Sequence, residues 1–255
     1  MRKGLNVVAE GYVFDLPIAA ALNCSDPSFV LNRRSPMLYK EIVFLITVVL
    51  CSGCSSLQTA GEMQSGRQAL LAGNMERALP YFQEVANKNP NYLYEAVLFR
   101  ESIWTYLGRS QYALGMLEPA RASFERALSV YRDDNLARIY LGLTLARTGD
   151  RSAAVKEIQS GMQGLHDWLD YMERSRPFTA YWDPLREIRA ELEKNVQMIA
   201  GKDIAWDQLI SSGEWIGKRM EEEIDNVRRD ERRQFERQDR DGRGSGTALG
   251  IGIGF

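Results

Sequence analysis

The chain has very little of the two residue types on which most metal sites and nucleophilic sites depend. It contains one histidine, His166, and three cysteines, Cys24, Cys51 and Cys54. A structural zinc site takes four such ligands, and a Ser-His-Asp triad needs a histidine held by an acid. His166 has Asp167 beside it, but adjacent side chains on a helix point about 100° apart and do not converge. We therefore expect no catalytic residues, no metal and no cofactor.

The chain also lacks an excess of one charge and a long apolar run. The formal net charge is −2, which argues against nucleic acid as a partner. The only continuous apolar run, from Ile42 to Cys51, has ten residues, whereas a membrane-spanning helix needs about 20. A run of this length is typical of a signal peptide, and Arg33, Arg34 and Lys40 supply its positive flank. The alternative is a buried helix that begins the fold, but the run is apolar on every side rather than amphipathic.

The apolar run ends in the residues LCSGCSS, which resemble the lipobox of bacterial lipoproteins. In that family a small residue precedes a cysteine whose thiol receives a diacylglycerol, and Gly53 and Cys54 match these two positions. Cys51 departs from the pattern, because the family usually has leucine or valine there. The resemblance implies lipidation of Cys54, with acyl chains such as palmitate that anchor the chain in the membrane. Because Ser55 follows instead of aspartate, it also implies a place in the outer membrane, facing the periplasm.

The first 36 residues show no sustained hydrophobic period. Met37 begins a complete short lipoprotein signal, MLYKEIVFLITVVLCSGC. We therefore expect residues 1–36 to be an over-extended, unstructured N-terminus, residues 37–53 to be the signal peptide, and residues 54–58 to be a lipidated linker. A long positively charged region, cleaved with the rest of the signal, is the alternative. In both cases the mature chain keeps one cysteine, Cys54, and has no intramolecular disulfide.

The mature chain contains an internal repeat. Pairs that recur 34 residues apart are Leu107 and Leu141, Gly108 and Gly142, Gly115 and Gly149, and Ala120 and Ala154. Upstream, Ala78 and Phe82 precede Ala120 and Phe124 by 42 residues, so eight residues are inserted between the first two units. Leu93, Val97, Trp104 and Leu107 continue a helical period through this insertion. We expect one long helix over about 92–114, and no segment of the chain shows a strand pattern.

This period and its residues resemble the tetratricopeptide repeat, whose pattern is W-x2-L-G-x2-Y, then Gly, then A-x3-F-x2-A. The best unit contains Trp104, Leu107, Gly108, Gly115, Ala120, Phe124 and Ala127, with its tyrosine shifted to Tyr112. The resemblance implies an all-α solenoid of helical hairpins with three repeats, at about 59–92, 101–134 and 135–168. Gly115 and Gly149 fall at the turns, and Asn74 and Asp150 can cap the helices that follow.

The resemblance also implies a binding surface, because the inner helices of tetratricopeptide solenoids line a concave groove. Carried onto this chain, the inner positions are Arg67, Leu70, Ser102, Thr105, Arg109, Tyr112, Leu136, Ile139, Leu143 and Arg147. Three arginines among apolar and hydroxyl side chains suit a peptide with acidic groups, since guanidinium binds carboxylates through two hydrogen bonds. The alternative is that these arginines only keep the groove soluble.

Apolar residues continue at helical spacing after the repeats, and Asp183 with Pro184 is a typical helix start. We expect capping helices over residues 169–216, with a partner-binding aromatic face around Trp182, Trp206 and Trp215 as the alternative. Residues 217–243 carry equal numbers of basic and acidic side chains and predict a solvated charged helix. The tail, residues 244–255, is Gly-rich. It is either disordered, an added strand on a partner's sheet, or a contact with the membrane.

The sequence thus predicts binding and not catalysis. We expect a membrane-anchored tetratricopeptide scaffold that binds a protein or peptide partner in the cell envelope, in the assembly or secretion of an envelope component. The alternative is a non-catalytic factor that activates or positions a cell-wall enzyme.

Overall fold

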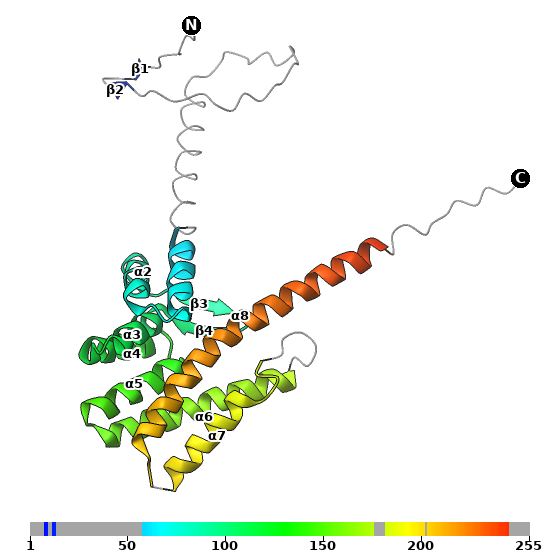
Figure 1. Cartoon of the computed structure of the whole chain (residues 1–255). Coiled ribbons are helices and arrows are strands. Elements are labelled where there is room, and N and C mark those ends of the chain that lie inside the picture. The colour runs from blue at the N-terminus through cyan, green and yellow to red at the C-terminus, as the bar shows by residue number, and fades with distance from the viewer. Residues whose placement is uncertain (1–7, 10–11, 14–57, 176–181, 202, 245–255) are drawn as a thin grey trace, which may run out of the picture. The chain divides into compact units, whose positions relative to one another are not determined.

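The computed structural model describes residues 8–9, 12–13, 58–175, 182–201 and 203–244 (Figure 1). The expected signal peptide, Cys54 and the Gly-rich tail from residue 245 onward lie outside the described residues. The chain divides into two units, Met1–Leu50 and Cys51–Phe255. In the first unit, strands β1 (Val8–Ala9) and β2 (Tyr12–Val13) pair antiparallel. These four residues are all that is described of residues 1–36, and the expectation of an over-extended, unstructured N-terminus stays a prediction for the rest.

The second unit is built from helical hairpins. The helix over residues 58–71 pairs with α2 (Met75–Lys88), α3 (Ile103–Ala113) with α4 (Leu117–Val130), and α5 (Asn135–Thr148) with α6 (Arg151–Ser175). Two further helices follow, α7 (Glu187–Ala200) and α8 (Trp206–Gly244). The protein is an all-α, tetratricopeptide-like solenoid, as the sequence predicted.

One close approach recurs in all three hairpins. Gly66 faces Phe82, Gly108 faces Phe124, and Gly142 faces Ile158. A Cβ atom on Gly108 would lie 2.6 Å from the Phe124 ring, which is too close for any real contact. The two helices of each hairpin can therefore approach only because the inner one has no side chain at this point. These pairs keep the spacings of 42 and 34 residues seen in the sequence, and Gly66 adds a match that the sequence analysis missed.

The turns between the paired helices follow the predicted chemistry. Gly115 and Gly149 adopt positive φ angles of 75° and 98°, a conformation that favours glycine. The Asn74 side chain accepts a hydrogen bond from the backbone N–H of Arg77 at 3.0 Å. Asp150 accepts one from the N–H of Ala153 at 3.1 Å. Both predicted caps are confirmed.

The eight inserted residues belong to a β-hairpin over residues 93–102, so the predicted long helix over 92–114 is wrong. Strand β3 (Leu93–Ala96) pairs antiparallel with β4 (Phe99–Ser102), and α3 begins directly after it. Burial alternates along β3, with Tyr94 buried and Leu93 exposed. The segment reads equally well with a period of two, and its helical pattern is interrupted by Arg100 and Glu101. The expectation that the chain has no strand was wrong for the same reason.

The helices after the repeats do not divide at the predicted boundaries. Helix α6 runs on from the third repeat to Ser175, and α8 is continuous from Trp206 to Gly244, through the expected break at residue 216. Asp183 does cap α7, since its carboxylate accepts hydrogen bonds from the N–H groups of Ile188 and Arg189 at 3.0 Å each. The helix itself starts later than expected, at Glu187.

Helix α8 crosses the inner side of the helical hairpins and then extends beyond them (Figure 1). Its buried apolar residues are Leu209, Ile216, Met220, Ile224 and Val227. No residue from 228 to 240 is buried, and Phe235 is 65% exposed. Helix α8 therefore keeps a buried face as far as Val227, so the predicted solvated charged helix over residues 217–243 is wrong for residues 217–227, and residues 228–240 are solvated.

Candidate partner-binding groove

The inner groove, formed by the helix over residues 58–71 together with α3 and α5, is occupied by α8 of the same chain. Six of the ten predicted groove residues contact α8 or line the cavity beside it: Arg67, Leu70, Arg109, Tyr112, Leu143 and Arg147. The structure therefore brings these six residues together beside a helix from the C-terminal part of the same chain, and their binding of another protein stays a prediction.

Arg67 is completely buried and joins the first repeat to α8. Its Nε atom donates to Glu221, and its terminal nitrogens donate to Tyr94 Oη at 2.7 Å and Asp225 Oδ1 at 3.1 Å. Burial lowers the pKa of the guanidinium, but the charge of Glu221 and its other neighbours outweighs that effect and raises the pKa above its usual value. Arg67 is thus a permanent, fully paired cation in the core.

Arg109 joins the second repeat to α8, as Arg67 joins the first. One of its terminal nitrogens lies 3.2 Å from Glu221 Oε2, and the other donates to the backbone carbonyl of Gly217 at 2.9 Å. Its guanidinium also lies 5.4 Å from the centre of the Tyr140 ring. Glu221 therefore binds Arg67 through one carboxylate oxygen and Arg109 through the other, so that one residue of α8 bridges two repeats.

The third contact lies at the edge of the groove. Arg147 and Tyr112 both donate to Glu214 Oε1, each at 2.7 Å. The Arg147 guanidinium stacks 4.3 Å above the centre of the Tyr112 ring. Both charged side chains are more than one-third exposed, so water screens this pair more than the two buried ones.

Two glycines let α8 lie close to α5. A Cβ atom on Gly213 would lie 2.9 Å from the Leu143 side chain, and one on Gly217 would overlap the Tyr140 ring. Glycine lowers the stability of a helix interior, so these positions are explained by the close approach. Because Gly213 and Gly217 are four residues apart, they lie on the same face of the helix.

The other four predicted residues do not face α8. Ser102, through its N–H, and Thr105, through its hydroxyl, both donate to Asp134 Oδ2, at 2.8 and 2.6 Å. Ile139 lies against Gly161 of α6, and Leu136 is fully buried. Ser102 and Thr105 thus join the start of α3 to the start of α5, whereas Ile139 packs inside the third hairpin. These four residues therefore lie outside the groove that α8 occupies, because the general repeat pattern does not separate groove positions from positions inside and between the hairpins.

A buried carboxyl, Glu101, lies next to this network. Its Oε2 atom accepts a hydrogen bond from Tyr106 at 2.6 Å, and Oε1 lies 3.7 Å from Arg109. Burial raises the pKa of Glu101 to about 8, because the loss of water and the repulsion from Glu221 outweigh the attraction of Arg109. Glu221 takes the closer place beside both arginines, which leaves Glu101 as the carboxyl that holds a proton at neutral pH.

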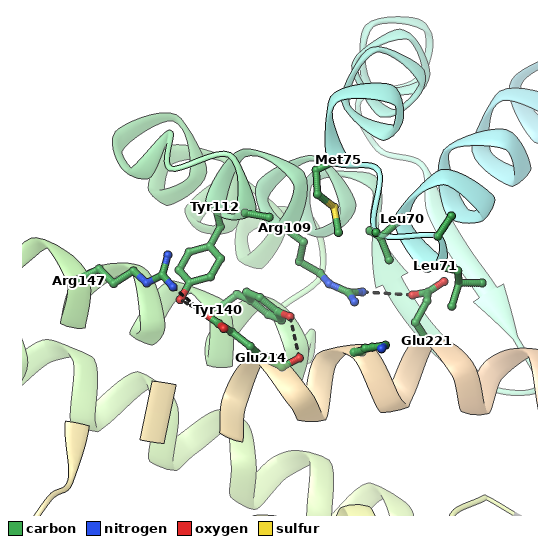
Figure 2. Close-up of a pocket in the computed structure, with 13 residues that line it drawn as sticks. Leu70, Leu71, Met75, Arg109, Tyr112, Tyr140, Arg147, Glu214 and Glu221 are labelled. Carbon is green, nitrogen blue, oxygen red and sulfur yellow. Dashed lines mark hydrogen bonds and ion pairs between the residues drawn. The ribbon is translucent and has the colours of Figure 1, made fainter. Parts of the chain in front are cut away.

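A cavity of about 450 Å³ remains beside α8 within the groove (Figure 2). Leu70, Leu71 and Met75 line its apolar side. Arg147, Tyr112 and Glu214 lie toward the other end. The resident helix therefore does not fill the groove completely.

The α8 residues that bind the groove, Glu214 and Glu221, were not predicted from the sequence. Glu221 and Glu223 are buried although they lie in a run that was interpreted as solvated. The signal that could have found them is the apolar spacing Ile216, Met220, Ile224 and Val227, which carries a buried face into the charged region. The alternative aromatic face is not a single surface either. Trp182 is 3% exposed and packs on Trp168 and Phe99, whereas Trp215 is 37% exposed.

Within the described ranges, no group of histidine, cysteine or acidic side chains could hold a metal ion. In the same part of the chain, no helix is both long enough and apolar enough to cross a membrane.

Residues 104–134, which comprise α4 and nearly all of α3, match the family model of the tetratricopeptide repeat. No curated protein matches the chain. The fold and this match over one hairpin support a tetratricopeptide-like repeat structure, of a kind that serves as a scaffold for protein–protein interaction. Repeat proteins of this kind are generally non-catalytic.

Proposed function

We propose that this chain is a membrane-anchored scaffold that binds a protein or peptide partner in the cell envelope. Binding by the inner groove is supported by one observation above all: the groove already holds a helix, through Arg67, Arg109 and Arg147. A surface that binds a helix of the same chain has the shape and charge to bind a similar segment of another protein. We expect that partner to be acidic where it meets the groove.

The proposed anchor is a lipid on Cys54. Its support is the sequence from Leu50 to Ser55, with a small residue before the cysteine and an apolar run before that. The first described helix begins at residue 58, so only a few residues separate the proposed lipid from the first repeat. Such an anchor would keep the groove close to the outer membrane, on its periplasmic side.

Site-specific photo-crosslinking in cells tests the scaffold function. A photoreactive amino acid replaces Ala72, an exposed residue that lines the cavity. The matched control replaces Lys156, which is exposed on α6 away from α8. We expect an adduct with a defined envelope protein from position 72 and not from position 156. No adduct at position 72, or the same adducts at both positions, would contradict the proposal.

A further inference from the structure

We propose that the inner groove is a receptor for an acidic helix of the partner, and that α8 is the resident helix that this partner replaces. The proposal rests on the scaffold function and adds the chemistry of the partner. The required helix carries two carboxylates seven residues apart, as Glu214 and Glu221 are, and two small residues four apart, as Gly213 and Gly217 are.

The charges of the groove define this spacing. Seven residues are about two turns of a helix, or about 10 Å, and place both carboxylates on one face. Arg147 meets the first carboxylate at the edge of the groove, while Arg67 and Arg109 share the second. The three guanidiniums come from three successive repeats. Their positions in the groove therefore set the spacing that the two acidic residues of a bound helix must have.

The way α8 is held favours exchange. Buried ion pairs fix how two helices align with each other more than they stabilise the contact. The cost of removing two charges from water offsets much of their attraction. A helix with the same carboxylates restores the same pairs with Arg67 and Arg109. Gly213 and Gly217 also lower the intrinsic stability of α8 as a helix, which reduces the cost of removing it from the groove.

The cavity gives the incoming helix further room. It lies between the Glu214–Lys218–Glu221 edge of α8 and the apolar residues Leu70, Leu71 and Met75. A partner helix with a larger apolar side chain along this edge would bury surface that α8 leaves open. The groove would then bind such a helix more tightly than its resident.

The test uses the full chain and a fluorescent peptide with the sequence of residues 206–228. In Gly217→Ala, the new methyl group meets the Tyr140 ring and weakens the packing of α8 in the groove, while no charged residue of the chain is changed. We expect this variant to bind the peptide at least tenfold more tightly than the unchanged chain does, measured by fluorescence anisotropy. Ser211→Ala changes an exposed residue of the same helix and should bind like the unchanged chain. A peptide with glutamine in place of Glu214 and Glu221 should lose binding to all three chains.

Hydrogen exchange on the unchanged chain gives a second measurement that needs no variant. Saturating peptide should make the backbone amides of residues 206–227 exchange at least tenfold faster, and the glutamine peptide should leave them unchanged. If the peptide neither binds Gly217→Ala nor changes the exchange of α8, then α8 is a permanent part of the core and the proposal is wrong. The scaffold function would still stand if the crosslink at position 72 is found.

Discussion

Arg109 on α3 and Glu221 on α8 lie 3.2 Å apart in the core, although 112 residues separate them in the chain. Glu221 is fully buried and Arg109 is 5% exposed. Arg67 contacts the other oxygen of the same carboxylate. This single side chain therefore connects the first two repeats to the C-terminal helix.

Glu221→Ala should lower the free energy of unfolding by about 3–5 kcal/mol, because it leaves two buried guanidiniums without their shared carboxylate. Glu222→Ala is the matched control. Its carboxylate is one-third exposed and pairs with Arg219 on the surface, so it should cost less than about 1 kcal/mol. The free energies of unfolding of both variants are measured by thermal or urea unfolding and compared with that of the unchanged chain. Equal effects would mean that α8 is not held through Glu221.

Ala120→Leu should destabilise the second repeat by about 1–3 kcal/mol, because Ala120 is fully buried and the added atoms overpack the hairpin. Phe124→Ala should cost about 3–5 kcal/mol, since it empties the space between Gly108 and α4. Ala122→Leu adds the same atoms as Ala120→Leu at an exposed position of α4 and serves as the control. If Ala120→Leu melts at the temperature of Ala122→Leu, the register of the repeat is wrong.

Stability should fall as the pH rises from about 5 to 8, through the titration of Glu101. Its pKa is near 4.5 as a free group and about 8 in the folded chain, so the folded state binds the proton more tightly. The folded state therefore loses stability as the pH rises between these two values, by at most about 1.4 kcal/mol per pH unit.

Glu101→Gln should remove this part of the pH dependence, because glutamine keeps an acceptor for Tyr106 and has no proton to lose. Melting temperatures of both chains at pH 5, 6, 7 and 8 provide the measurement. Parallel curves for the two chains would show that Glu101 is not the titrating group.

The processing of the N-terminus follows from the lipobox resemblance. Cys54→Ala should leave an uncleaved precursor without lipid, whereas Cys51→Ala should be processed as the unchanged chain is. Mass spectrometry of the mature N-terminus distinguishes them. An unmodified Cys54 in the unchanged chain would rule out the lipid anchor.

The parts of the fold that the sequence predicted correctly depend on local spacing. Gly108 and Ala120 with their equivalents mark where two helices touch, and Gly115 and Gly149 mark where the chain turns. Each of these roles belongs to one hairpin, and the hairpins repeat. The same short-range pattern therefore occurs three times in the sequence. For this reason the fold class of the chain could be predicted without the structure.

The inserted β-hairpin could not be predicted in this way. Residues 92–102 fit both a helical period and an alternating one, and the choice depends on what each face meets in space. Tyr94 is buried because its hydroxyl accepts hydrogen bonds from Arg67 and from Arg228 of α8. Both arginines are far from Tyr94 in the chain, so local spacing contains no information about these contacts.

The sequence by itself determined a repeat solenoid with an arginine-rich inner surface, and only the tertiary structure decided what covers that surface. Glu221, Glu222 and Glu223 are chemically identical neighbours, yet the first is buried between two arginines and the second lies on the surface. A carboxylate leaves water only where other groups replace its hydration, and at Glu221 these groups are guanidiniums. Those guanidiniums come from Arg67 and Arg109, more than 100 residues away, and folding alone brings them to Glu221.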